Sequence, residues 1–216
     1  MRILVVGMGL IGGSICKSIK AATSHAVYGC DVQQAVLDDA IADGAIDGTG
    51  TMTDGTYDMI ILCLHQRIAI QMVQEALPKI PAGTILVDTC GLKGRMVRDL
   101  TYRCRKAGVR YVGTHPMAGR EKNGYYASIP NLFQNANLIV TPVDGTDEAA
   151  LDTVKELADQ MGFGKIVTAT PMWHDNMIAY TSQLAHVVSS SYVKDFCMDD
   201  ALSFSGGSFQ DMTRVA

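Results

Sequence analysis

Three glycines near the N-terminus constrain the fold more than any other feature of the chain. Gly7, Gly9 and Gly12 form the pattern G-x-G-x-x-G between the apolar run Ile3–Val6 and a helical segment, and Asp31 follows 19 residues after the third glycine. A tight turn, a close backbone approach to a pyrophosphate and helix–strand packing each require glycine at one of these places. The pattern therefore predicts a dinucleotide-binding unit rather than a glycine-rich turn that binds no ligand.

The same segment indicates which dinucleotide is bound. We expect the N–H groups at the start of the helix, including those of Leu10 and Ile11, to face the phosphates. We expect Asp31 to accept hydrogen bonds from the adenosine ribose hydroxyls. A carboxylate at this place repels a 2′-phosphate, and the next residues, Val32, Gln33 and Gln34, carry no compensating cation. The sequence therefore predicts NAD as the cofactor rather than NADP.

Strand-length apolar runs alternate with helix-length segments through the first 170 residues. The predicted strands are Ile3–Val6, His25–Cys30, Met59–Leu64, Thr84–Val87, Arg110–Val112, Leu138–Thr141 and Ile166–Ala169. The predicted helices are Leu10–Lys20, Gln34–Ala42, Ile68–Leu77, Gly94–Ala107 and Asp147–Met161. This order predicts an α/β fold, a Rossmann-type doubly wound and mostly parallel sheet with helices on both faces. Ligands of such sheets lie beyond the carboxyl ends of the strands, so we assign Leu64, His65 and Thr89 to the cofactor site.

The pattern changes after Thr170. Residues 173–192 contain neither glycine nor proline, which predicts a helix longer than the ~10–14 residues usual in globular proteins. We therefore expect a nucleotide-binding domain at residues 1–170 and the first part of a helical domain at residues 171–216. A long helix with an apolar face and no covering partner is poorly stable alone, so we expect a second copy of the chain to cover it.

Composition excludes several classes of protein. The chain of 216 residues is 48% hydrophobic and 19% charged, as in ordinary globular proteins, and its formal net charge of −4 disfavours nucleic-acid binding. No run reaches the ~18 apolar residues of a membrane span. Glycines interrupt the apolar N-terminal run, which argues against a signal helix and leads us to expect a cytoplasmic protein. The six cysteines form no C-x-x-C pair, so we expect no metal site.

A histidine in the middle of the chain is the candidate catalytic base. His115 follows the predicted strand Arg110–Val112, and we expect it just past the carboxyl end of that strand, on the cofactor side. An enzyme that takes a hydride from an alcohol needs a base for the hydroxyl proton, and histidine titrates near neutrality. Pro116 restricts the backbone of the histidine to extended geometry. The alternative is a loop histidine without a role.

The long predicted helix carries a polar stripe. At ~100° per residue, five positions fall on one face of a continuous helix: Asp175, Ala179, Ser182, His186 and Ser189. One interpretation is a solvated face. A second interpretation is the lining of a cleft between the domains, where hydroxyls and a histidine hold a polar, anionic substrate.

Three motifs occur in order along the chain: GMGLIGGS at Gly7–Ser14, HPMAGRE at His115–Glu121, and SQLAH at Ser182–His186 with GGSFQDMTRVA at Gly206–Ala216. Together they resemble the prephenate dehydrogenase family, which includes arogenate dehydrogenases. The resemblance implies a Rossmann domain followed by a helical dimerisation domain, hence a homodimer. It also implies NAD-dependent oxidative decarboxylation of prephenate to 4-hydroxyphenylpyruvate, on the way to tyrosine. The helical domain of the family continues past Arg214, so we expect either a truncated chain or a family member that lacks most of its dimerisation helices.

The resemblance also implies the roles of particular residues. His115 corresponds to the histidine that assists deprotonation of the ring hydroxyl, and Arg214 to the arginine that binds a substrate carboxylate. Glu121 corresponds to an acid that gates or orders the cleft. The remaining implied substrate contacts are Ser182, Gln183, His186 and Gly207.

Two departures from the family pattern concern the choice of substrate. The family often has S-H-L-P-H where this chain has Gln183 and Ala185 in place of the second histidine and the proline, and many members have a serine where Gly91 stands. These changes leave prephenate and arogenate both open, and the retained His186 favours prephenate.

Two different functions are compatible with the same two-domain plan. The first is that of a 3-hydroxyacid dehydrogenase, which needs a catalytic lysine in the helical domain. Lys194 is the only lysine after Lys165, and it lies off the polar stripe, so it is poorly placed for that role. The second is that of a non-catalytic module that senses NAD.

Overall fold

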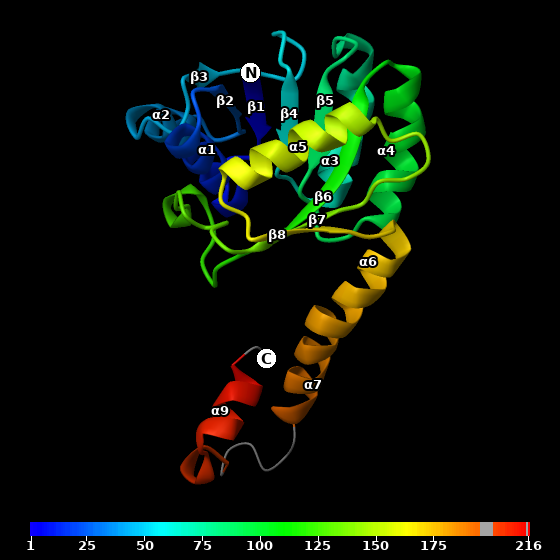
Figure 1. Ribbon diagram of the computed structural model, residues 1–216. Coiled ribbons are helices and arrows are strands. Elements are labelled where there is room, and N and C mark those ends of the chain that lie inside the picture. The colour runs from blue at the N-terminus through cyan, green and yellow to red at the C-terminus, as the bar shows by residue number, and fades with distance from the viewer. Residues whose placement is uncertain (195–200, 215) are drawn as a thin grey trace. The chain divides into compact units, whose positions relative to one another are not determined.

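The computed structural model describes residues 1–194, 201–214 and 216, and it divides the chain into two compact units. The first unit is Met1–Pro171 and the second is Met172–Ala216. The first contains the sheet and the helices that pack on it, and the second is helical (Figure 1).

One sheet of eight strands organises the first unit. The strands are β1 (Arg2–Val6), β2 (Ala26–Cys30), β3 (Gly48–Thr49), β4 (Met59–Leu62), β5 (Ile85–Asp88), β6 (Arg110–Met117), β7 (Asn137–Val140) and β8 (Lys165–Thr168). Their order is β3-β2-β1-β4-β5-β6-β7-β8, and every neighbouring pair from β3 to β6 is parallel. This is the 3-2-1-4-5-6 order of the dinucleotide-binding fold. The predicted Rossmann-type, mostly parallel sheet is confirmed.

Helices cover both faces of the sheet (Figure 1). They are α1 (Leu10–Ala22), α2 (Gln34–Ala42), α3 (Gln66–Ala76), α4 (Gly94–Lys106) and α5 (Glu148–Gln160). Alternate strand residues enter opposite layers: Ile3 and Val5 pack with α1, α2 and α5, whereas Leu4 and Val6 pack with α3 and α4. Burial on both faces explains why these strands are continuous apolar runs in the sequence.

Two features of the sheet differ from the prediction. β3 has only two residues, Gly48 and Thr49, and no apolar pattern, so the sequence carried no strand signal there. β6 runs to Met117, well beyond the predicted Val112. Its second half, Thr114–Met117, continues as a strand because it pairs antiparallel with β7, a partner that local sequence does not reveal.

The second unit begins at the second residue of α6 (Pro171–Ile178). A π-helical turn (Ala179–Gln183) and α7 (Leu184–Tyr192) follow, and the unit also contains α9 (Gly207–Thr213). The rings of Tyr192 and Phe209 lie 5.5 Å apart and join α7 to α9. The predicted long helix is present from Pro171 to Tyr192, but the π turn interrupts its regular α-helical geometry. None of the described helices is long and apolar enough to cross a membrane.

The π turn also changes the predicted polar stripe. A π turn uses more residues than an α-turn, so side chains after it are rotated relative to those before it. Asp175 and Ala179 therefore lose the alignment with His186 and Ser189 that a continuous helix would give. Ser189 is also buried, whereas His186 is exposed. The prediction of a single narrow stripe is wrong for this reason.

Candidate active site

The glycine turn between β1 and α1 has two positions where the fold itself excludes a side chain. Gly7 has φ +94°, a conformation that L side chains rarely adopt, and a β-carbon there would lie 2.5 Å from the carbonyl oxygen of Cys63. A β-carbon on Gly12 would collide with the carbonyl oxygen of Gly7. Both glycines are therefore required by the path of the chain.

Gly9 differs from these two glycines because the protein does not fill the space around it. No atom outside the glycine's immediate chain neighbours lies within 4 Å of a β-carbon built there. Gly9 is the N-cap of α1, and among the described residues no side chain caps that helix and no acid occupies its first turn. The first N–H groups of a helix have no acceptor within the helix, and together with the helix dipole they attract anions. The turn therefore fits the phosphate group of a nucleotide, with Leu10 and Ile11 in the first helical turn.

Asp31 lies beside this turn, directly after β2. One carboxylate oxygen accepts a hydrogen bond from the Met8 N–H at 2.7 Å, and the other accepts one from the Gln33 N–H at 2.9 Å. The carboxylate is therefore fixed against the glycine turn while its residue stays partly exposed. Val32, next to it, is 100% exposed.

The other predicted cofactor residues lie at the carboxyl ends of the neighbouring strands. The Leu64 side chain reaches within 2.8 Å of the place of a β-carbon on Gly7. His65 is the exposed N-cap of α3. Thr89 follows β5, and its hydroxyl donates to the Leu62 carbonyl at 3.1 Å. The structure therefore brings these residues to the edge of the sheet where the glycine turn lies.

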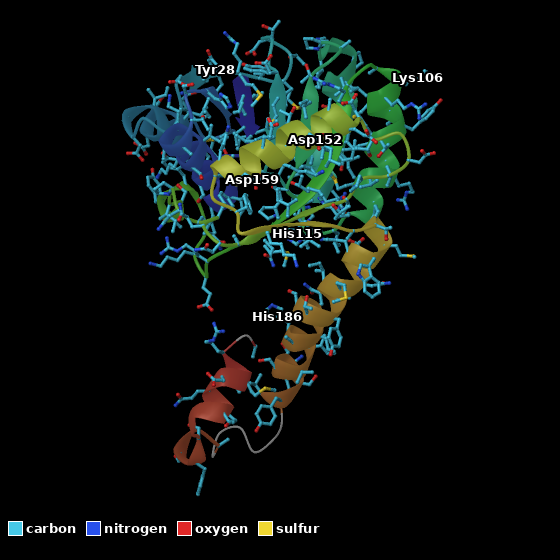
Figure 2. All side chains as sticks on the ribbon, viewed as in Figure 1. Tyr28, Lys106, His115, Asp152, Asp159 and His186 are labelled. Carbon is cyan, nitrogen blue, oxygen red and sulfur yellow. The ribbon has the colours of Figure 1, made fainter. Side chains whose placement is uncertain are left out.

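His115 lies within β6, not past its end, so the predicted position is corrected. β6 leaves its parallel partner at Gly113, which pairs with Asp88, the last residue of β5. His115 pairs with Ile139 of β7 instead. The histidine thus lies beyond the carboxyl end of β5 but on a strand, which is a more rigid support than a loop. Figure 2 shows it at the end of the unit opposite to Lys106, the last residue of α4.

A buried polar network lies next to His115, and it was not predicted from the sequence. Its members, which we call the Asp88 network, are Asp88, Lys93, Tyr111 and Thr114. The side chains of Asp88 and Lys93 form an ion pair and are both 0% exposed. Burial and the Asp88 carboxylate raise the pKa of Tyr111 well above its usual value. The available signal was an acid at the end of an apolar strand followed five residues later by a lysine at the start of a helix.

The segment after β6 carries Glu121, whose residue is exposed. This segment is anchored on the α1–α2 side of the unit. Tyr125 donates to Asp43 at 2.9 Å and Tyr126 donates to Asp39 at 2.6 Å, while the Lys17 ammonium lies 4.5 Å from the centre of the Tyr125 ring. These contacts attach the segment that follows His115 to the helices around the glycine turn.

The remaining predicted substrate residues belong to the second unit. Ser182 and Gln183 lie in the π turn, and His186 lies on α7. Gly207 begins α9, and Arg214 is its C-cap. π turns within α-helices are frequent at functional sites, so the position of Ser182 and Gln183 agrees with their predicted role in substrate binding. Among the described residues, no group of three or more His, Cys, Asp or Glu side chains could hold a metal ion.

Comparisons with known families cover almost the whole chain. The family model described as "Prephenate dehydrogenase, nucleotide-binding domain" matches residues 15–168. The model described as "Prephenate dehydrogenase, dimerization domain" matches residues 170–216. The first match begins after the glycine turn, so the turn is evidence separate from it.

Two curated relatives show the range of the similarity. The prephenate dehydrogenase of Bacillus subtilis is 29% identical over 223 residues, which cover 99% of this chain and 60% of the relative. This chain therefore spans about three-fifths of that relative's length. The cyclohexadienyl dehydrogenase of Zymomonas mobilis is 31% identical over 227 residues, which cover 100% of this chain and 76% of the relative.

Solved structures agree with these matches. A prephenate dehydrogenase from A. aeolicus, in complex with hydroxyphenyl propionate and NAD+, has a TM-score of 0.84 and 28% identity, covering 100% of this chain and 78% of the other. A Synechocystis arogenate dehydrogenase has a TM-score of 0.86 and 27% identity, with the same coverage. A 3-hydroxyisobutyrate dehydrogenase from Mycobacterium tuberculosis, at 18% identity and a TM-score of 0.66, shares the fold. With family models that match both units, the chain belongs to the prephenate dehydrogenase family.

Proposed function

We propose that the chain catalyses the NAD-dependent oxidative decarboxylation of prephenate to 4-hydroxyphenylpyruvate. The observation that carries the proposal is the placement of His115. It lies on β6 beyond the end of β5, so it belongs to the edge of the sheet at which the glycine turn also lies. An alcohol that transfers a hydride to a dinucleotide bound at that edge needs a base there to accept its hydroxyl proton.

The proposed cofactor is NAD. The open space at Gly9 and the first-turn N–H groups of Leu10 and Ile11 would take the pyrophosphate. Asp31 would hydrogen-bond the ribose hydroxyls and repel a 2′-phosphate, with the exposed Val32 offering no cation. The NAD+ in the A. aeolicus relative supports this choice.

In the proposed reaction, the bound nicotinamide supplies the hydride acceptor. His115 accepts the proton of the hydroxyl on the substrate ring. The ring carbon that carries this hydroxyl loses its hydride and becomes a carbonyl carbon. The ring carboxylate then leaves as carbon dioxide, and its bonding electron pair makes the ring aromatic. The ring oxygen takes the proton back from His115 and becomes the phenol hydroxyl of the product. Arg214 would bind a substrate carboxylate with its planar guanidinium, and Ser182 and His186 would provide polar contacts to the substrate.

Arogenate is the second candidate substrate. It carries an amino acid side chain where prephenate carries a keto acid, so the residues around that end of the substrate decide between them. Gln183 and Ala185 depart from the family pattern in this region, while His186 is retained and supports prephenate. The similarity to a Synechocystis arogenate dehydrogenase keeps arogenate as the alternative.

We also propose a homodimer formed through the second unit. Its helices expose large apolar side chains, among them Leu184 at 46%, Val187 at 60% and Tyr192 at 50%. A second copy of the chain would cover this surface, and the description of the family model that matches residues 170–216 supports that occupant. Light scattering on the purified chain would report the mass of the assembly.

The decisive experiment follows NADH absorbance with purified protein and prephenate. Arogenate, a 3-hydroxy acid and NADP+ are tested in parallel reactions. We expect NADH formation with prephenate and NAD+. Turnover of arogenate alone would assign the second substrate, and turnover of the 3-hydroxy acid alone would contradict the proposed chemistry. Tight NAD+ binding without any turnover would indicate a sensing module instead.

A further inference from the structure

The Asp88 network is buried, and none of its four residues is assigned a role in the reaction proposed above. Asp88 ends β5, and its carboxylate is the centre of the network. One oxygen accepts hydrogen bonds from the Lys93 ammonium and, at 2.9 Å, from the Cys90 N–H. The other oxygen accepts from the Tyr111 hydroxyl at 2.6 Å.

Two further bonds of the network hold the residue immediately before His115. The Thr114 hydroxyl donates to the main-chain carbonyl of Asp88 at 2.6 Å. The Lys93 ammonium donates to the main-chain carbonyl of Thr114. Both the side chain and the backbone of Thr114 are therefore fixed, and the peptide that Thr114 shares with His115 has its carbonyl held by a buried cation.

The network also fixes the loop that lies against the imidazole. Gly91 is in the loop between Asp88 and Lys93, and a β-carbon built on it would lie 3.7 Å from Nε2 of His115. The ion pair joins the two ends of this short loop, and the Cys90 N–H bond fixes its start. The backbone before His115 and the wall beside its ring thus depend on the same buried pair.

The position of the Asp88 network in the sheet explains why Thr114 needs these hydrogen bonds. β6 pairs with β5 only as far as Gly113, so no described strand pairs with Thr114 or the residues after it on that side. The hydrogen bonds from Lys93 and Thr114 replace the missing ladder bonds at this point. Stability alone is a weak reason for such a pair, because desolvation of two buried charges often exceeds their attraction.

We propose that Asp88 and Lys93 are positioning residues for His115, acting through the Thr114 carbonyl and the Gly91 loop. The inference rests on the proposed function for its kinetic consequence. The structural part of the proposal, the orientation of the His115 imidazole, requires neither substrate nor cofactor and is tested separately.

The main variant is Lys93→Met, and Lys106→Met is its matched control. Lys106 is the exposed last residue of α4, at the opposite end of the unit from His115 (Figure 2). We expect kcat of Lys93→Met to fall on the order of 100-fold, because an error of ~1 Å in a reacting group has about this effect. The NAD+ dissociation constant and the KM for prephenate should stay within about twofold of wild type, whereas a general loss of structure would change all three.

Histidine NMR gives the second readout. The chain has five histidines, and comparison with a His115→Asn variant assigns the His115 imidazole signals. We expect those signals to shift in Lys93→Met and to stay in place in Lys106→Met, while the His25 signals stay in place in both. His115 signals and kcat that both match wild type in a folded Lys93→Met protein would overturn the proposal. A loss of NAD+ affinity equal to the loss of kcat would also overturn it.

Two more variants keep the test decisive. If Lys93→Met does not fold, the double variant Asp88→Asn with Lys93→Met removes both charges and leaves no uncompensated ion. Tyr111→Phe removes one hydrogen bond and keeps the ion pair. We expect His115 shifts in both, smaller in Tyr111→Phe, and their absence in folded protein would overturn the proposal. If the wild type does not turn over prephenate, the proposed function fails, and the NMR comparison still decides the positioning role.

Discussion

A β-carbon on Gly91 would lie 3.7 Å from Nε2 of His115, an ordinary van der Waals distance. The backbone of Gly91 has no positive φ, so a small side chain fits there without strain. Gly91→Ser would place a hydroxyl within reach of the imidazole. We expect it to hold the ring and raise kcat by a factor of about 2 to 10, as a typical net hydrogen bond of ~0.5–1.5 kcal/mol implies. Gly91→Ala is the control, and equal kcat values for the two variants would contradict the prediction.

In the glycine turn, Gly12 is required by the fold, whereas Gly9 is required only by the proposed ligand. Gly9→Ala meets no protein atom within 4 Å, whereas Gly12→Ala places its methyl group against the Gly7 carbonyl. We expect Gly9→Ala to keep the wild-type Tm but to weaken NAD+ binding, and Gly12→Ala to lower Tm or prevent folding. Thermal unfolding and NAD+ titration measure the two effects. Unchanged NAD+ affinity in Gly9→Ala would remove this turn from the cofactor site.

The sequence predicted the core of the fold because each local signal agreed with the tertiary environment. Strands buried on both faces are continuous apolar runs, and α2 was predicted with the observed bounds, Gln34–Ala42. It did not predict β3, which consists of two residues without apolar character, or the extension of β6 to Met117. Both depend on pairing with strands distant in the sequence. The π turn at Ala179–Gln183 was missed because a helical pattern carries no mark of an inserted residue.

The candidate site was predictable only where function leaves a motif. The glycine turn, Asp31 and His115 belong to such motifs. In the structure these motifs lie at the same edge of the sheet. The ion pair of Asp88 and Lys93 has no periodic signal, and a lysine near a helix start is normally read as an exposed residue. Its burial follows from the meeting of β5, β6 and α4, which local sequence does not reveal.

His115→Ala tests the base directly. We expect kcat to fall by ~10²–10⁴, the usual contribution of a general base, with NAD+ affinity preserved. His25→Ala is the control, because His25 precedes β2 and contacts the N-terminal amine at 3.3 Å, outside the proposed site. Turnover that survives in His115→Ala would show that another group takes the proton.

Asp31 has an observed contact and a proposed role, and two substitutions separate them. Its carboxylate both faces the proposed ribose site and accepts the Met8 N–H at 2.7 Å. Asp31→Asn removes the charge and keeps an oxygen acceptor, whereas Asp31→Ser shortens the side chain as well. We expect NADP+ affinity to rise on the order of tenfold in both, as loss of ~1.4 kcal/mol of charge repulsion implies, with a lower Tm in Asp31→Ser. A parallel loss of affinity for both cofactors would indicate a purely structural role.

Substitution of Arg214, the C-cap of α9, tests whether the second unit binds the substrate. Arg214→Ala should raise the KM for prephenate about 10- to 150-fold, because a hydrogen bond to a charged group contributes ~1.5–3 kcal/mol. Arg214→Lys keeps the charge but loses the two-pronged geometry, so an intermediate KM is expected. NAD+ affinity should stay constant in both variants, since the proposed cofactor residues all belong to the first unit. A KM that is unchanged in Arg214→Ala would place the substrate carboxylate on another cation.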